Sequence, residues 1–382
     1  MNLFDVYPLF DINPVRGQGC YIWDDKGTRY LDLYGGHAVI SIGHSHPYYT
    51  KRIARQLYDI GFYSNSVQMP MQEELAVKLG ELSGYPDYSL FLCNSGAEAN
   101  ENAIKLASFQ TGRKKIIAFK GAFHGRTSAA VAATDNPSII APVNETDNVV
   151  FLPLNDLEAF ALALKEHGDE LAAVIVEGIQ GVGGVHIPEP TFLKVVEAGC
   201  RKSGALLILD EVQSGYGRSG KFFAHQHAGV NPDLITIAKG MGNGFPIGGV
   251  LISPEIEAKH GMLGTTFGGN YLACAAGLAV LEVMQQEQLV DNANRIGQRL
   301  KEQLQNMPGV CEVRGQGLMI GVELEEACAP IRKELLEKHR IFTGSSSDKN
   351  TLRLLPPLTI GVREVEAFVT AFEAIVCTLK EK

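Results

Sequence analysis

The sequence predicts an α/β protein in which a seven-stranded, mostly parallel sheet is joined to a smaller α+β domain. Seven short apolar runs lie between residues 88 and 253, and they are rich in β-branched residues without polar alternation. Strands have this composition when helices cover both faces of their sheet. The stretches 98–110 and 192–202, between the runs, have apolar residues at helical spacing. A length of 382 residues is enough for about two to three domains.

The expected strands of the sheet, in chain order, are 88–94, 114–121, 148–153, 171–178, 205–212, 234–240 and 248–253. Before them, residues 16–33 predict a hairpin with its turn at 24–27. After residue 270 come a long helical pattern, short apolar runs in 310–324 and 351–360, and a closing helix at 362–379. We therefore expect an N-terminal segment of the small domain (1–54), a large domain (55–255), and a long linking helix with the rest of the small domain (256–382).

Composition excludes several classes of protein. Apolar residues make up 45% of the chain and charged residues 20%, which fits a folded protein and not a disordered one. The net charge of −9 argues against a nucleic-acid binder. No stretch approaches the roughly 20 apolar residues of a membrane span, and the amino terminus lacks a secretory pattern. Seven scattered cysteines without a CxxC pair favour reduced thiols, so we expect a cytoplasmic protein.

Two expected strands end in segments that suit binding of an anion and an aromatic ring. Residues 93–98 (CNSGAE) place Ser95, Gly96 and Ala97 where a helix begins, and small residues at a helix amino end suit a phosphate. Residues 121–126 (GAFHGR) offer Phe123 for stacking and Arg126 for a carboxylate. Taken alone, each segment also fits an ordinary turn with surface side chains.

Two further strand ends bring an acid and an amine. Asp210 closes a wholly apolar run, and a carboxylate there needs a cationic or N–H partner. Lys239 lies where an apolar run meets a glycine-rich loop, and desolvation would make its neutral amine nucleophilic toward carbonyls. Together, the four segments are the parts of a pyridoxal 5′-phosphate (PLP) site. The phosphate takes the helix end, the ring takes Phe123, the pyridinium nitrogen takes Asp210 and the aldehyde takes Lys239.

Other motifs are weak. The HxH pairs at 44–46 and 225–227 have no third ligand at a recognised metal spacing, so we expect no metal site. The chain contains no dinucleotide fingerprint after a strand, no phosphate-binding P-loop and no serine-hydrolase elbow.

The segments 94–98, 123–126, 209–220, 238–240 and 264–270, in this order, resemble the class III, or ω-amino-acid, branch of fold-type I PLP-dependent aminotransferases. Within that branch the likeness is greatest to the acetylornithine and succinylornithine aminotransferases. The resemblance implies transfer of the terminal amine of an acylated ornithine to 2-oxoglutarate, in arginine biosynthesis. It also implies a homodimer.

The resemblance implies a role for each matched residue. Lys239 and Asp210 would be catalytic, and Arg126 and Arg353 would bind substrate carboxylates, Arg353 that of glutamate or 2-oxoglutarate. His37 and Tyr7 would lie at the substrate entrance. The implied cofactor-binding residues are Ser95, Gly96, Ala97, Phe123, Glu177, Asp210, Gln213 and Lys239, with Thr266 supplied by the neighbouring subunit and Glu177 contacting Gln213 or the site wall.

One position departs from the family pattern. Members commonly read E-P-I-Q-G-E-[AG]-G, whereas residues 177–184 read EGIQGVGG, so Val182 replaces an acid that usually screens Arg353. We expect Arg353 to stay exposed to the pocket, which would favour N-succinylornithine, with its extra carboxylate, over N-acetylornithine. Compensation by another acid or by water is the alternative.

Two other functions stay open at this point. Another ω-aminotransferase, acting on ornithine, 4-aminobutyrate or a diamine, shares these motifs. A glutamate-semialdehyde aminomutase shares the frame without a second substrate, and Arg353 argues against it. A non-catalytic binding protein would have no use for both Lys239 and Asp210.

Overall fold

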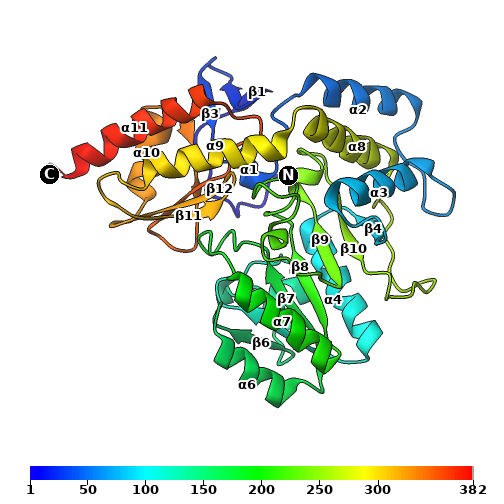
Figure 1. The fold of residues 1–382 in the computed structure, drawn as a ribbon. Coiled ribbons are helices and arrows are strands. Elements are labelled where there is room, and N and C mark those ends of the chain that lie inside the picture. Colours follow the sequence, from blue (N-terminus) through cyan, green and yellow to red (C-terminus); the bar gives the residue numbers. More distant parts are fainter. Residues whose placement is uncertain (381–382) are drawn as a thin grey trace.

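A computed structural model describes residues 1–380 (Figure 1). Its central sheet contains all seven expected strands, in the order β4-β10-β9-β8-β7-β5-β6. β10 runs antiparallel to both its neighbours, and the pairs among β6, β5, β7, β8 and β9 are parallel. The strands are β4 (Ser89–Cys93), β5 (Lys115–Phe119), β6 (Val149–Leu152), β7 (Leu171–Glu177), β8 (Leu206–Asp210), β9 (Leu234–Ile237) and β10 (Gly248–Ile252). The predicted mostly parallel sheet is confirmed.

Helices cover both faces of this sheet, which explains why its strands are continuously apolar. Side chains of β7 alternate, so that Val174 and Val176 pack with helices α6 (Leu157–His167) and α7 (Pro190–Ser203). Ala173 and Ile175, between them, pack with helix α4 (Gly96–Thr111) on the other face. Every residue of β7 is buried. In Figure 1, α4 and α7 lie on opposite sides of the strands.

Two smaller sheets are built from the ends of the chain. The predicted hairpin forms β1 (Pro14–Gln18), β2 (Tyr21–Asp24) and β3 (Arg29–Asp32), and β13 (Ile341–Phe342) extends it in parallel with β3. The other sheet has the order β11-β12-β15-β14, formed by Val310–Gln316, Met319–Leu324, Thr351–Leu354 and Gly344–Ser345. The pairing of β3 with β13 joins the N-terminal hairpin to the C-terminal part of the chain.

The remaining helices connect and cover these sheets. Helix α8 packs against α2 and α3, and α9 packs against β11 and α11 (Figure 1). Their bounds are α1 (Gly35–Ala38), α2 (Pro47–Asp59), α3 (Pro70–Ser83), α5 (Ser128–Ala132), α8 (Tyr271–Gln286), α9 (Leu289–Leu304), α10 (Ala329–Glu337) and α11 (Val362–Lys380). Within residues 1–380, no helix is long and apolar enough to cross a membrane.

The expectation of one long linking helix after residue 270 is wrong. The pattern divides into α8 and α9, because Gln288 adopts a left-handed conformation with φ of 50°. The apolar spacing continues across the break, which is why the sequence reads as one helix. Single left-handed residues end a helix without disturbing the pattern on either side of it.

Gln288 tests the origin of this break. Its side chain is exposed, so a substitution there changes backbone preference more than packing. Gln288→Gly should raise the free energy of unfolding by up to about 1 kcal/mol, because glycine adopts this conformation without a Cβ clash. Gln288→Val should lower it by about 1–2 kcal/mol. Urea unfolding measures both effects: a shift of the midpoint, with the dependence of the free energy on urea concentration unchanged, gives the change in stability. Gln285→Gly is the control, because Gln285 is exposed and lies inside α8, where glycine should lower the free energy of unfolding. An equal loss of stability in Gln285→Gly and Gln288→Gly would contradict this explanation of the break.

Candidate functional site

The carboxyl ends of β4, β5, β7, β8 and β9 meet at one edge of the central sheet, where open α/β sheets bind ligands. A cavity of about 370 Å³ lies there. Nine of the predicted site residues line it, and they come from all five strand ends: Ser95, Gly96, Ala97, Phe123, Arg126, Glu177, Asp210, Gln213 and Lys239. The structure therefore brings most of the predicted site together.

Asp210 is buried at the end of β8, in register with Glu177 of β7. Asn100 Nδ2 and His124 Nδ1 each lie 2.7 Å from Asp210 Oδ2, and the Val212 N–H donates to Oδ1 at 3.0 Å. Charge-assisted bonds of this kind stabilise a buried carboxylate. The expectation that Asp210 needs close partners is confirmed.

Asn100 and His124 were not predicted as site residues. Asn100 lies inside α4 and is fully buried, and its Oδ1 accepts from Thr236 Oγ1 at 2.6 Å. His124 Nε2 is buried and has no hydrogen-bond partner among the described residues. The only sign in the sequence is that His124 stands between Phe123 and Arg126; Asn100 has none, because its role depends on the packing of a helix on the sheet.

Glu177 forms the wall behind Phe123. Its Oε1 accepts from the Phe123 N–H and its Oε2 from the Gly181 N–H, both at 2.9 Å. Of the two expected positions, the structure shows the cavity wall, since Glu177 lines the cavity and both its carboxylate oxygens accept from backbone N–H groups. Burial raises the pKa of Glu177 to about 7, although nearby His124 opposes the shift. Glu177 thus fixes the loop that carries the stacking ring.

The start of α4 forms an anion cradle. Gly96 and Ala97 belong to its first turn, where N–H groups have no acceptor within the helix. Ser95 caps the helix, accepting from the Glu98 N–H at 3.2 Å. A Cβ on Gly96 would lie 2.5 Å from Val212 Cγ1, so only glycine fits between the cradle and the opposite wall. N–H groups and a helix dipole at such an end favour a phosphate.

Lys239 follows β9 and lines the cavity. Its backbone is left-handed, with φ of 45°, which is a strained conformation for a residue with a side chain. Burial lowers the pKa of Lys239, and Asp210 and Glu177 oppose that shift only in part. A neutral amine is therefore more accessible than in an exposed lysine, as the sequence predicted.

The two predicted arginines differ in their relation to the cavity. Arg126 lines it directly and is exposed. Arg353 in β15 reaches it through Gln213, donating from Nη1 to Gln213 Oε1 at 3.2 Å, and its Nε donates to Ser345 O at 2.5 Å. Its expected exposure is wrong, since its residue surface is only 3% accessible. Among the described residues, however, no carboxylate forms an ion pair with Arg353, and burial lowers its pKa.

His37 lies on a left-handed turn in which Gly35, Gly36, His37 and Ala38 have φ of 56°, 55°, 67° and 64°. Gln213 Nε2 donates to the His37 carbonyl at 3.1 Å, and the Tyr34 and His37 rings lie 4.6 Å apart. Burial lowers the pKa of His37, and the charges of Arg353 and Lys239 lower it further. The imidazole is therefore close to both cations, although it does not line the cavity itself.

Tyr7 and Thr266 lie outside the cavity. Tyr7 belongs to the N-terminal segment and is 73% exposed. Thr266 is exposed in the loop after β10, next to Phe267. The structure of one chain brings neither residue to its own site.

The HxH pairs serve other contacts. His44 Nε2 pairs with Asp32 and His46 Nε2 with Glu287, at 2.8 and 2.9 Å. Buried His225 bonds Glu211 through Nδ1, at 2.7 Å. Among the described residues, no group of three or more His, Cys, Asp or Glu side chains could hold a metal ion.

The cavity fits PLP on four observations. It has an acid at its base in Asp210, a partly buried amine in Lys239, an aromatic wall in Phe123 and a helix-end cradle at Gly96. The loop of Phe123 packs directly on the cradle, since a Cβ on Gly125, whose φ is 139°, would lie 2.7 Å from Ala97 Cβ. The unpartnered Nε2 of His124 leaves a polar atom for a bound group. These residues match the needs of a phosphate, a pyridine ring and an aldehyde.

Comparison with known proteins agrees with this geometry. The family model for class-III aminotransferases matches residues 5–376. The acetylornithine aminotransferase of Bacillus subtilis is 43% identical over 375 residues, which are 97% of this chain and 96% of that protein. That of Archaeoglobus fulgidus is 43% identical over 361 residues, 93% and 92% of the two chains.

A solved ornithine aminotransferase from Toxoplasma gondii, with PLP at partial occupancy in its active site, superposes with a TM-score of 0.91. It is 29% identical, and the match covers 99% of this chain and 92% of that one. Both sequence and structure therefore lead to one family. The chain belongs to the class-III aminotransferases and is a PLP-dependent enzyme of fold type I.

Proposed function

We propose that the enzyme moves the terminal amino group of an N-acylated ornithine to 2-oxoglutarate, giving glutamate and the acylglutamate semialdehyde. One observation carries the proposal: Lys239 and Asp210 share a cavity that has Arg126 on its wall and Arg353 behind Gln213. An amine-handling centre with two guanidinium groups suits a donor and an acceptor that each carry a carboxylate. The acetylornithine aminotransferases among its relatives support an acylornithine donor and a place in arginine biosynthesis.

The cofactor supplies an electron sink for the substrate carbon when it is bound. Asp210, whose carboxylate is fixed by Asn100 and His124, would keep the pyridine nitrogen protonated. Lys239 takes and returns a proton at the carbon that bears the donor's amine, which its lowered pKa favours. Ser95 and the Gly96 and Ala97 N–H groups would hold the phosphate. Phe123 would stack on the ring, and Gln213 would bind near the ring hydroxyl.

Arg126 binds the donor's α-carboxylate and Arg353 binds that of 2-oxoglutarate. The arginines lie on different elements, the loop after β5 and strand β15, so each substrate has its own carboxylate seat. Arg353 makes an aminomutase a poor alternative, since that reaction needs no second substrate. Another ω-aminotransferase is the second candidate, supported by the similarity to the ornithine aminotransferase.

The donor is proposed to be N-succinylornithine in preference to N-acetylornithine, on the absence of a counterion for Arg353 and not on its exposure. Val182 lines the cavity where an acid is common in the family, and no ion pair of Arg353 is found among the described residues. Because Arg353 contacts the cavity only through Gln213, the extra carboxylate would reach it beside that side chain. His37 and Tyr7 remain proposed residues of the entrance.

A homodimer is proposed, in which Thr266 of each subunit binds the phosphate in the partner's site. Thr266 is exposed and lies outside its own cavity. Exposed apolar side chains occur on α2, just after α2 and directly next to Thr266. Such a group is typical of a surface that a partner subunit covers. These side chains are Leu57, Tyr58, Phe62, Tyr63 and Phe267.

We also propose that residues 1–54 and 256–382 form the small domain and residues 55–255 the large domain. The proposed location of the enzyme is the cytoplasm.

Replacing Lys239 tests the centre of the site. Purified Lys239→Ala should lose the visible absorption of bound cofactor and nearly all transamination, a loss of about a hundredfold or more, because no amine remains to bind the aldehyde or move the proton. Absorption spectra after incubation with PLP and desalting check this. Lys202→Ala, on an exposed position of α7, is the control. An unchanged spectrum in Lys239→Ala would show that Lys239 is not the amine that binds the cofactor.

A panel of amino donors tests the substrate. With 2-oxoglutarate as acceptor, kcat/KM should be highest for N-succinylornithine, followed by N-acetylornithine, and lower for ornithine and 4-aminobutyrate. A charge-assisted bond to the extra carboxylate should be worth about tenfold or more between the two acylornithines. Equal kcat/KM values for the two acylornithines, or a higher value for N-acetylornithine, would contradict the proposed effect of Val182. Fastest turnover of ornithine or 4-aminobutyrate would favour the second candidate.

Mixed dimers test the place of Thr266. The Thr266→Ala and Lys239→Ala enzymes should each have low transamination activity when PLP is limiting. If Thr266 acts in the partner's site, a mixed dimer of the two has one intact site, so mixing and reassociation should restore up to about half of the activity per mixed dimer. If Thr266 acts in its own subunit, or not at all on the cofactor, mixing restores nothing beyond the Thr266→Ala activity.

A further inference from the structure

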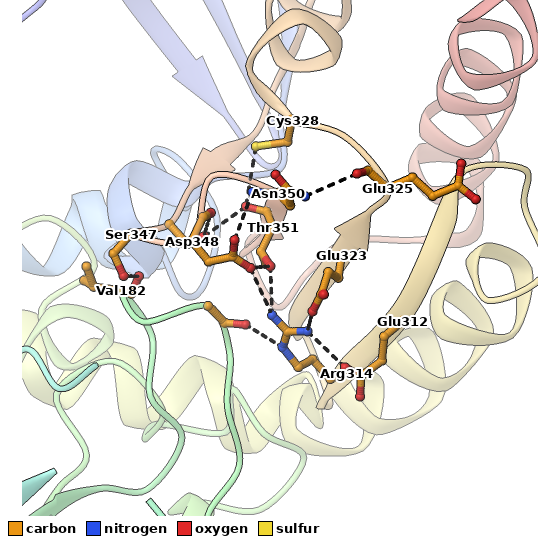
Figure 2. A network of polar contacts seen from close by, with 12 residues as sticks. Val182, Glu312, Arg314, Glu323, Glu325, Cys328, Ser347, Asp348, Asn350 and Thr351 are labelled. Carbon is orange, nitrogen blue, oxygen red and sulfur yellow. Dashed lines mark hydrogen bonds and ion pairs between the residues drawn. The ribbon is translucent and has the colours of Figure 1, made fainter. Parts of the chain in front are cut away.

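Arg314 in β11 is a buried cation outside the cavity that joins three segments of the chain (Figure 2). Its Nε donates to Gly184 O at 2.7 Å, and its Nη2 donates to Thr351 Oγ1 at 2.8 Å. Nη1 donates to Glu312 at 3.0 Å and also to Glu323. The three nitrogens of the guanidinium are thus directed to different elements, an arrangement that a lysine cannot reproduce.

The first of these elements is the loop after β7, which carries Val182 into the cavity. The Val182 carbonyl accepts from the Ser347 N–H at 2.8 Å and from Ser347 Oγ at 3.1 Å (Figure 2). The loop is closely packed, since a Cβ on Gly181 would lie 1.8 Å from Gln213 Oε1 and one on Gly183 would lie 2.6 Å from Gly121 O. The loop therefore has little room to shift without moving the cavity wall.

The second element is the turn 345–351, which leads into the strand of Arg353. Ser345 O accepts from Arg353 Nε at 2.5 Å. At the other end of the turn, Thr351 Oγ1 donates to Asp348 Oδ2 at 2.5 Å, and Asp348 lies 3.7 Å from Arg314 Nη2. Arg314 thus holds the end of the turn at Thr351 while Ser347 holds its middle on Val182.

We propose that Arg314 is a positioning residue for the acceptor substrate. It fixes the loop of Val182 and the turn 345–351 on one another, and so sets the position of the Arg353 guanidinium against the cavity. The inference rests on the proposed function, in which Arg353 binds the carboxylate of 2-oxoglutarate. Among the described residues no hydrogen bond or ion pair joins Arg314 to Arg126, so we expect the donor's carboxylate seat to depend less on this cluster.

The charges around Arg314 determine the useful variant. Glu312, Glu323 and Asp348 all face its guanidinium. A neutral substitution would leave three carboxylates without their cation and would risk unfolding. Arg314→Lys keeps the charge and removes the forked bonds to Gly184 and Thr351.

The two half-reactions of the holoenzyme, measured separately by single-turnover spectroscopy, test the proposal. In Arg314→Lys, the 2-oxoglutarate concentration at half-maximal rate should rise about tenfold or more, because a displaced guanidinium binds the carboxylate poorly. The N-acetylornithine half-reaction should change less than about threefold. Thr351→Val, which removes one acceptor without changing charge, should shift the same constant in the same direction by about threefold. It keeps the test valid if Arg314→Lys does not fold.

Arg299→Lys is the matched control, because Arg299 forms an exposed ion pair with Glu366 and makes none of the bonds described above. It should leave both half-reactions unchanged. Equal losses in both half-reactions of the Arg314 and Thr351 variants, or no loss in either, would overturn the role of Arg314. A wild-type enzyme that fails to react with 2-oxoglutarate would instead overturn the proposed function, and this inference with it.

Discussion

The burial of Asp210 is the constraint on which the rest of the site depends. An ionised carboxylate at the end of a central strand costs several kcal/mol unless donors replace its water. Asn100 from α4, His124 from the loop after β5 and the Val212 N–H supply them. One carboxylate therefore ties a helix, a loop and a turn to the sheet. These groups fix Asp210 in the cavity lining, where the proposed function needs an acid beside the cofactor's ring nitrogen.

The same edge of the sheet concentrates positive charge in an acidic protein. The chain has a net charge of −9, yet Arg126 and Lys239 line one cavity and Arg353 contacts it through Gln213. Burial raises the pKa of Glu177, which favours its neutral form and leaves less negative charge beside these groups. The cavity is therefore suited to anionic substrates, although the surface as a whole is not.

The sequence predicted the parts that depend on local pattern. Continuous apolar runs gave the seven strands, and reading only their carboxyl ends led to Asp210, Lys239, Phe123 and the Gly96 cradle. Contacts between distant elements could not be read in this way. The bonds of Asn100 to Asp210, of Glu177 to two backbone N–H groups and of Arg314 to Gly184 depend on side-chain direction and packing. The break at Gln288 was missed because a single left-handed residue leaves the apolar period intact.

The central claim is that this cavity transfers a terminal amine to 2-oxoglutarate. It is tested most directly by following an isotopic nitrogen label from an acylornithine through the holoenzyme. Label placed on the terminal amino group should appear in glutamate, in amounts equal to the semialdehyde formed. Label retained in the donor, or found in a rearranged donor without any glutamate, would contradict the account.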